Sequence, residues 1–135
     1  VVTARQFRLV VDEPAELGGT DGGANPVEHV LAGLAGCLSV VAHVVARELG
    51  FTIRALEIAV SGTLDPARFL GEATTARAGY REIQAVLRVS SDADASTLER
   101  WIAAVRGRCP VSDNLAHPTP VRVVPQVSGA AGTGT

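Results

Sequence analysis

The sequence contains no lysine and no methionine, and only 4% of its 135 residues are aromatic. So few aromatic side chains disfavour a platform on which nucleic-acid bases stack. The formal net charge is −2, and basic residues form no cluster of the kind that marks a nucleic-acid-binding surface. We therefore expect no nucleic-acid partner.

Cysteine is also scarce. Two cysteines are too few for a disulfide-rich secreted scaffold. The first residues lack the basic region and apolar run of a signal peptide. The apolar run from Val30 to Ala46 is shorter than the ~20 residues that a membrane span needs. These absences predict a cytoplasmic protein without a membrane partner.

A long helix is the strongest structural signal. Asn25 is a good N-cap, Pro26 suits the first helical position, and Glu28 adds negative charge to the first turn. The helical pattern continues to Leu49, and Gly50 is a natural stop, which gives a helix about 36 Å long. Because apolar or small residues cover nearly every face of this helix, we expect it to be buried all round. In so small a chain, that burial suggests a homodimer.

The remaining pattern predicts an α+β domain in which two buried helices pack on antiparallel sheets. A capping box from Ser96 to Glu99 should begin the second helix, and Gly107 should end it. We expect one domain over residues 1–127 and a flexible C-terminal tail over 128–135. Strands are predicted over residues 6–11, 51–64, 83–89 and 120–124, a flexible glycine loop over 18–23, and an irregular exposed segment over 68–79.

The two cysteines are the best clue to chemistry. Cys37 lies in the apolar helix, and Cys109 precedes Pro110, which predicts a helix N-terminus. The positive end of a helix dipole favours a thiolate at Cys109. The two thiols would then be partners in a redox cycle. The alternatives are a buried Cys37 that acts as a small hydrophobe, a structural disulfide, or a zinc site, although the ligand set lacks C-x-x-C spacing.

Two runs resemble one known family. The segment from Asn25-Pro26 to Gly36-Cys37 and the segment Arg108-Cys109-Pro110-Val111-Ser112 are similar to the motifs of the OsmC/Ohr family of osmotically inducible and organic-hydroperoxide-resistance proteins. The resemblance covers roughly residues 5–125. It implies an intertwined homodimer in which sheet from both chains wraps two long central helices. Each active site would lie at the dimer interface.

The resemblance also implies a reaction. In peroxidase members the first cysteine attacks a hydroperoxide, so Cys37 would become a sulfenic acid and release an alcohol or water. Cys109 would then form a disulfide with Cys37, and an external dithiol would reduce that disulfide. No metal or organic cofactor is implied, because sulfur carries the electrons. Arg5 and Arg8 are the candidates for an arginine that supports the reactive thiolate.

One position departs from the family pattern. Peroxidase members carry a glutamate directly after Asn-Pro, and this chain has Val27 there, with Glu28 one residue later. On a helix, Glu28 lies about 180° from Cys37, whereas His29 lies about 80° from it. His29 is therefore a candidate for the border of a pocket there, although such a histidine is more often a hydrogen-bonded residue or one at the solvent edge. Glu28 is most simply a favourable charge on the helix dipole. The departure favours an alternative reading, a non-catalytic module of the same fold that binds a small apolar ligand at the dimer interface. A third reading is a small thiol protein that senses oxidation.

Overall fold

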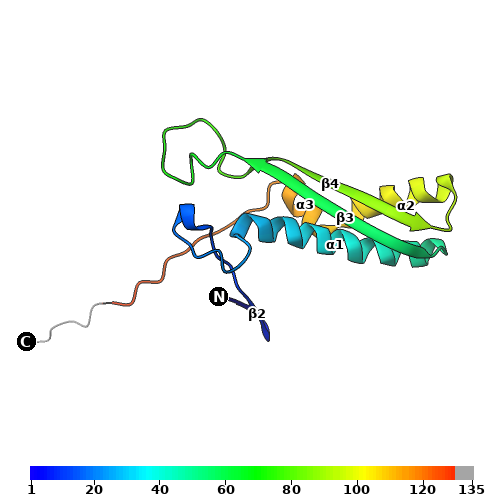
Figure 1. Ribbon diagram of the computed structural model, residues 1–135, viewed down its shortest axis with the longest axis horizontal. Coiled ribbons are helices and arrows are strands. Elements are labelled where there is room, and N and C mark those ends of the chain that lie inside the picture. The colour runs from blue at the N-terminus through cyan, green and yellow to red at the C-terminus, as the bar shows by residue number, and fades with distance from the viewer. Residues whose placement is uncertain (130–135) are drawn as a thin grey trace, which may run out of the picture.

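The computed structural model describes residues 1–129 and has an α+β architecture (Figure 1). Two antiparallel two-stranded sheets accompany three helices. The predicted fold class is thereby confirmed. The elements are β1 (Val2–Ala4), β2 (Phe7–Leu9), the 3-10 turn η1 (Ala15–Leu17), α1 (Pro26–Leu49), β3 (Ile53–Leu64), β4 (Tyr80–Ser91), α2 (Ala95–Arg108) and α3 (Pro110–Ala116).

The long helix α1 forms as its end signals predict. The Asn25 side chain accepts a hydrogen bond from the Glu28 backbone N–H, and the Glu28 carboxylate accepts one from the Asn25 N–H, so both halves of a capping box are present. Gly50 ends the helix in the left-handed conformation, with φ of 77°. By length and composition alone this 24-residue helix is able to cross a membrane. In this structure it is instead the central helix of the fold.

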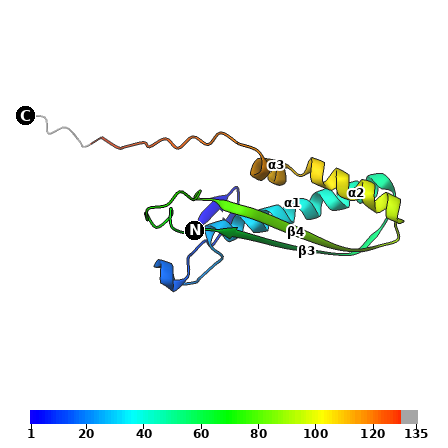
Figure 2. The same cartoon turned by 90° about the horizontal axis from the view of Figure 1, so that it is seen from above.

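The central helix α1 lies between two layers, with the β3–β4 hairpin on one side and α2 and α3 on the other (Figure 2). Strands β3 and β4 are antiparallel from Ile53 opposite Ser91 to Leu64 opposite Tyr80. Exposed and half-buried residues alternate along both strands, and the half-buried ones form the face that packs toward α1. The strand predicted over residues 83–89 is therefore longer at both ends, because pairing with β3 extends it.

The core joins α1 to α2. The Trp101 side chain is 2% exposed, and its indole N–H donates a hydrogen bond to the Ala42 carbonyl at 2.9 Å. Phe51 meets the indole edge-on at a centroid distance of 6.2 Å. The buried residues of the core are Leu34, Leu38, Ala42, Val45, Ala46, Trp101, Val105 and Cys109.

Several predicted boundaries are wrong. Asp94, rather than Ser96, caps α2 by accepting a hydrogen bond from the Thr97 N–H at 2.8 Å. Gly107 lies inside α2, which ends at Arg108. Pairing with β1 limits the predicted strand over residues 6–11 to Phe7–Leu9. Residues 120–124 form no strand, because none of the described residues pairs with them.

The expectation that α1 is buried all round is also wrong for the single chain. Its buried residues lie on one face, while Val40 on the opposite face is 65% exposed. A Cβ atom added at Gly33 or Gly36 would meet no atom within 4 Å. One side of an apolar helix is therefore open to solvent.

The glycine loop after β2 is organised rather than unstructured. The Asp12 carboxylate accepts hydrogen bonds from the Thr20 N–H, the Thr20 hydroxyl and the Gly22 N–H, and these bonds hold the pKa of Asp12 far below its ordinary value. Gly19 is required here, because an added Cβ would lie 1.8 Å from the Glu13 carbonyl oxygen. As predicted, the segment over 68–79 is irregular and mostly exposed. The predicted tail lies mostly outside the described residues, since only its positions 128 and 129 are covered.

Candidate functional site

The two cysteines come together where α1 passes α3. Cys37 lies midway along α1 and is half-buried, and Cys109 is 2% exposed at the N-cap of α3. Both are free thiols, and Cys37 packs against the core cluster that contains Cys109. The helix start predicted from Cys109-Pro110 is confirmed. The fold thus places a partly accessible thiol beside a buried one.

The electrostatics of Cys109 differ from the sequence-based expectation. Its Sγ accepts a hydrogen bond from the Ser112 backbone N–H at 3.4 Å, as an N-capping group does. Burial nevertheless raises the pKa of the Cys109 thiol, the adjacent Cys37 thiol adds to that rise, and the Ser112 N–H only opposes it. The predicted thiolate at Cys109 is therefore wrong, because desolvation outweighs the end of a short helix. Cys109 is a neutral thiol at pH 7.

This difference predicts the order of thiol labelling. In the reduced protein at pH 7, iodoacetamide should alkylate Cys37 first. Cys109 should react at least about tenfold more slowly than Cys37, because it is buried and protonated. The Cys109 rate should keep rising with pH beyond the ordinary range of a cysteine, since its thiolate forms only there. Peptide mass mapping of a labelling time course measures both rates. Faster labelling of Cys109 than of Cys37 at pH 7 would contradict this electrostatic picture.

An ion pair positions the segment that carries Cys109. The Arg108 guanidinium contacts the Glu48 carboxylate through two nitrogens, one of them at 3.0 Å, and Arg108 lowers the pKa of Glu48. This pair joins the last turn of α1 to the last residue of α2, directly before Cys109. The sequence pattern includes Arg108 in the second motif but does not predict its pairing with Glu48, because the two residues are 60 positions apart.

The candidate supporting arginines lie elsewhere. Arg5 has φ of 54°, and its guanidinium stacks over the Phe7 ring at 4.9 Å from the centroid. Arg8 lies exposed on β2. The β1–β2 hairpin projects beside the N-terminal end of α1 (Figure 1), whereas Cys37 lies halfway along that helix. Among the described residues of one chain, the structure brings neither arginine to a cysteine.

Glu28 and His29 have local structural partners. Glu28 completes the capping box of α1, which agrees with its simplest interpretation. The His29 Nε2 lies 3.3 Å from the Val10 carbonyl oxygen and ties the helix to the segment after β2. Val27, which replaces the glutamate of peroxidase members, accepts a hydrogen bond from the Tyr80 hydroxyl through its carbonyl at 2.6 Å. These contacts leave the carboxylate–arginine support of the thiol unassembled within one chain.

A cavity of about 470 Å³ lies beside the thiol pair, between β4, α1 and the helices α2 and α3. Leu34 and Leu38 of α1 line it, and so does Ser112 of α3, whose backbone N–H contacts the Cys109 sulfur, but neither cysteine lines it. Arg106 is its charged side chain, and sequence patterns gave no signal for it. In the part of the chain that the structure describes, no three histidine, cysteine, aspartate or glutamate side chains gather as a metal site.

The fold and the thiol pair define a class of α+β protein built around one long central helix that carries a cysteine. The chain belongs to the OsmC-like protein family, whose model matches residues 19–124. The predicted family is thereby confirmed. Comparison with curated proteins gave no match.

Solved structures agree with this family. An OsmC-like protein from Mycoplasma pneumoniae is 26% identical, with a TM-score of 0.71 over 84% of this chain and 76% of its own. An organic hydroperoxide resistance protein OsmC from Legionella pneumophila is 22% identical, with a TM-score of 0.58 over 82% and 74%. An OsmC-like hydroperoxide resistance protein from a Jannaschia species is 18% identical, with a TM-score of 0.59 over 83% and 75%. The last two support the fold alone.

Proposed function

We propose that this protein is a thiol-dependent peroxidase that reduces organic hydroperoxides through Cys37 and Cys109. The observation that carries the proposal is the meeting of two free thiols, one partly accessible on α1 and one buried on α3. Membership of the OsmC-like family and the names of the Legionella and Jannaschia proteins support the choice of a hydroperoxide as substrate. The apolar surroundings of Cys37, which packs against the hydrophobic core, favour an organic hydroperoxide over hydrogen peroxide.

The reaction proceeds in three balanced steps. The Cys37 thiolate attacks the terminal oxygen of the hydroperoxide, the O–O bond breaks, and an alcohol leaves after taking up a proton. The Cys109 sulfur then attacks the Cys37 sulfenic acid, which forms a disulfide and releases water. An external dithiol reduces that disulfide and becomes oxidised itself. Sulfur carries both electrons, so the scheme needs no metal or organic cofactor.

The protonation state of Cys109 bears on the second step. Because its pKa is raised, Cys109 keeps its proton while Cys37 is reduced, and it gives up this proton as its sulfur attacks, since the thiolate is the nucleophile. The departing hydroxide of the sulfenic acid accepts that proton and leaves as water. A neutral resolving thiol also spares the reactive Cys37 the repulsion of a second negative charge.

A steady-state assay tests this function. The purified protein, supplied with dithiothreitol, should consume cumene hydroperoxide catalytically and should consume hydrogen peroxide more slowly. Cumene hydroperoxide and hydrogen peroxide differ in the apolar body that the surroundings of Cys37 would contact. Absence of turnover with both peroxides and with a second dithiol, dihydrolipoamide, would overturn the proposal.

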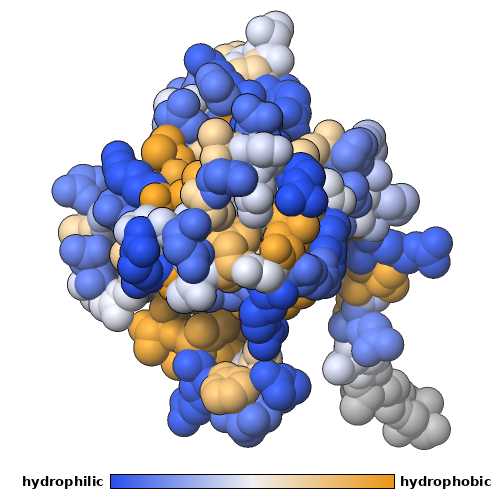
Figure 3. All heavy atoms as spheres, turned by 90° about the vertical axis from the view of Figure 1, so that its right-hand side faces the viewer, coloured by the Kyte–Doolittle hydropathy of each residue, from blue (hydrophilic) through white to orange (hydrophobic). Residues whose placement is uncertain are grey.

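We further propose that the protein acts as a homodimer in which the open face of α1 packs against a second copy. Val40 is exposed on this face beside the small residues Gly33 and Gly36, which allow a close approach. All residues of β1 and β2 are exposed, and an isolated two-stranded hairpin is marginal in water. Seen from the end that carries α2, the surface is a mixture of hydrophobic and hydrophilic side chains (Figure 3). The exposed apolar residues of α1, β1 and β2 favour an interface.

A charge on the open face of α1 should break the dimer. Val40→Glu would bury a carboxylate in the proposed interface, whereas it leaves the single chain almost undisturbed because Val40 is 65% exposed. We expect light scattering to show a dimer for the parent protein and a monomer for the variant at the same concentration. Ala103→Glu, at an exposed position of α2, is the matched control and should stay dimeric. A monomeric parent protein at micromolar concentration would contradict the proposal.

The competing function is a non-catalytic module that binds a small apolar ligand at the dimer interface. Val27 favours it, because this position offers no carboxylate to orient an arginine. Binding of an apolar ligand that is unaffected by Cys37→Ser, together with absent peroxide turnover, would support this alternative. A cytoplasmic location stays a prediction.

A further inference from the structure

The segment that carries Cys109 is a junction between two helices. Cys109 is the C-cap of α2 and also the N-cap of α3, and its own backbone is extended. The helix α3 that follows has only seven residues, and none of them is buried. A short helix with so little burial gives the chain little anchorage. The position of the Cys109 sulfur therefore depends on the contacts that the end of α2 makes with α1.

One of these contacts is the ion pair between Arg108 and Glu48. The guanidinium donates from Nη1 to one carboxylate oxygen and from Nη2 to the other, the second contact at 3.0 Å. Two parallel hydrogen bonds fix the direction of such a pair as well as its length. Glu48 follows Cys37 by about three helical turns, so the two residues lie on the same side of α1. The junction is therefore held against one side of α1 at two points, at Cys37 and at Glu48.

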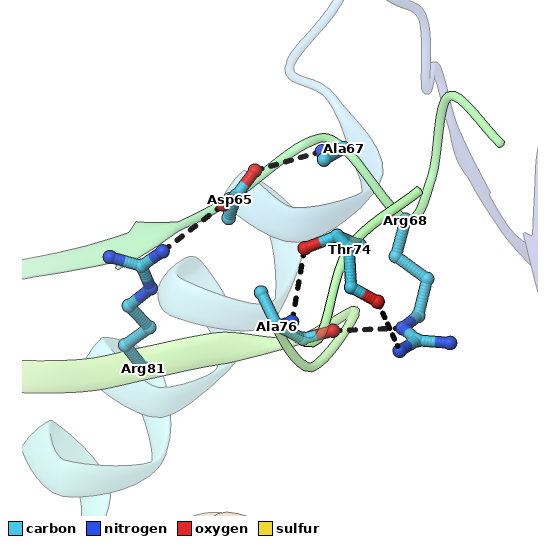
Figure 4. Close-up of polar contacts among 6 residues, drawn as sticks. All are labelled: Asp65, Ala67, Arg68, Thr74, Ala76 and Arg81. Atoms are coloured by element: carbon cyan, nitrogen blue, oxygen red, sulfur yellow. Dashed lines mark hydrogen bonds and ion pairs between the residues drawn. The ribbon is translucent and has the colours of Figure 1, made fainter. Parts of the chain in front are cut away.

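This ion pair differs from the others in what it joins. The pair of Arg81 with Asp65, for example, lies at the loop end of the β3–β4 hairpin, where Asp65 also accepts a hydrogen bond from the Ala67 N–H (Figure 4). Among the described residues, only the Arg108–Glu48 pair joins one helix to another. A contact between distant segments closes a longer loop and so restricts the chain more than a contact within a hairpin.

Formation of a disulfide makes strict demands on this junction. The two sulfurs must approach to about 2 Å, with the two Cα atoms within about 7 Å of each other. Both thiols are free in the structure, so the Cys109 sulfur still has to close on Cys37. A junction that stays close to α1 raises the effective concentration of Cys109 at Cys37 and speeds their reaction. We therefore expect a contact that restrains the junction to favour the disulfide.

We propose that Arg108 and Glu48 are positioning residues for the disulfide between Cys37 and Cys109. The inference rests on the proposed function, because it concerns the second step of that cycle. In this step the two sulfurs form a bond, the S–O bond of the Cys37 sulfenic acid breaks, and the hydroxide leaves as water with the proton from Cys109. The guanidinium and the carboxylate bind each other rather than the sulfur atoms. The pair acts on the second step alone, because attack of Cys37 on a hydroperoxide does not involve the junction.

A redox titration with glutathione measures the effect without any hydroperoxide. The protein is equilibrated anaerobically with mixtures of reduced and oxidised glutathione, and peptide mass mapping gives the fraction that contains the Cys37–Cys109 disulfide. Glu48→Gln and Arg108→Gln should each lower the equilibrium constant for this disulfide about threefold, as expected for the loss of one exposed ion pair. The two side chains are 52% and 46% exposed, so neither substitution should disturb the fold.

Stopped-flow kinetics separate the two steps of the reaction. Formation of the Cys37 sulfenic acid from cumene hydroperoxide, detected by trapping with dimedone, should keep the parent rate constant in both variants. Conversion of the sulfenic acid to the disulfide should slow about threefold, because the effective concentration of Cys109 falls. A general loosening of the fold would instead change both rate constants.

Rescue and control variants assign the effect to the ion pair. Exchanging the charges in the double variant Glu48→Arg with Arg108→Glu should restore most of the lost equilibrium constant. Arg108→Lys should lose less than Arg108→Gln, because an ammonium group keeps the charge but not the parallel hydrogen bonds. Arg81→Gln and Glu57→Gln are the matched controls, since each breaks an exposed ion pair of the hairpin, and both should titrate like the parent protein.

Two results would overturn this assignment. The first is a parent-like glutathione equilibrium and second-step rate in folded Glu48→Gln and Arg108→Gln. The second is equal slowing of both steps without recovery in the charge-exchanged variant, which would mean that the substitutions act through the fold as a whole. The expected shifts in the glutathione equilibrium, found together with no peroxide turnover in the parent protein, would support this assignment and contradict the peroxidase function alone.

Discussion

Replacing Cys37 by serine should abolish hydroperoxide reduction and leave the fold intact. A hydroxyl cannot accept the peroxide oxygen and pass it to a neighbouring thiol, so we expect turnover to fall by more than about 10³-fold, as on loss of a covalent nucleophile. Serine is close to cysteine in size, and position 37 is half-buried, so the core of α1 should tolerate it. Steady-state consumption of cumene hydroperoxide with dithiothreitol, beside far-UV circular dichroism, measures both consequences.

Cys109→Ser is the informative control for this experiment. It should still consume one equivalent of hydroperoxide and then accumulate a Cys37 sulfenic acid, because the resolving thiol is missing. Trapping with dimedone and mass spectrometry identifies that species. A Cys37→Ser protein that turns over at the parent rate would assign the chemistry to another group.

Replacing Trp101 by alanine should produce the largest loss of stability. Trp101 is 2% exposed, it meets Phe51 edge-on, and its indole N–H donates to the Ala42 carbonyl. Removing this side chain leaves a cavity between α1 and α2, which typically costs about 3–5 kcal/mol in the free energy of unfolding. Urea denaturation followed by circular dichroism measures the change. Fluorescence does not serve, because Trp101 is the only tryptophan.

Trp101→Phe separates packing from the hydrogen bond. Phenylalanine fills part of the volume but has no donor for the Ala42 carbonyl. The free energy of unfolding should therefore fall by less than in Trp101→Ala, by about 1–2 kcal/mol. The parent protein and both variants should be unfolded at the same protein concentration, because a dimer gains apparent stability by mass action. A loss below about 1 kcal/mol for Trp101→Ala would show that α2 contributes little to the core.

The sequence predicts elements whose signals are local. Asn25, Pro26 and Gly50 mark the ends of α1, and each acts through its own backbone geometry and nearest neighbours. Cys109-Pro110 marks the start of α3 for the same reason. The alternation from Ile53 to Leu64 follows from the pleat of a strand that is covered on one face.

Properties that depend on contacts between residues far apart in the chain could not be predicted from the sequence. Asp94 and Ser96 are both good caps, and the local pattern does not show which of them begins α2. The direction of the Cys109 pKa shift follows from burial under α1, which no residue near Cys109 reveals. The valines of the predicted strand over residues 120–124 remain exposed, because a strand forms only against a partner.

One measurement tests the central claim most directly: the count of free thiols before and after one equivalent of cumene hydroperoxide, followed anaerobically by stopped flow. The account predicts rapid loss of both thiols and a Cys37–Cys109 disulfide in the peptide map. It also predicts recovery of both thiols when dithiothreitol is added. Thiols that persist for minutes in the folded, reduced protein would contradict a peroxidatic pair.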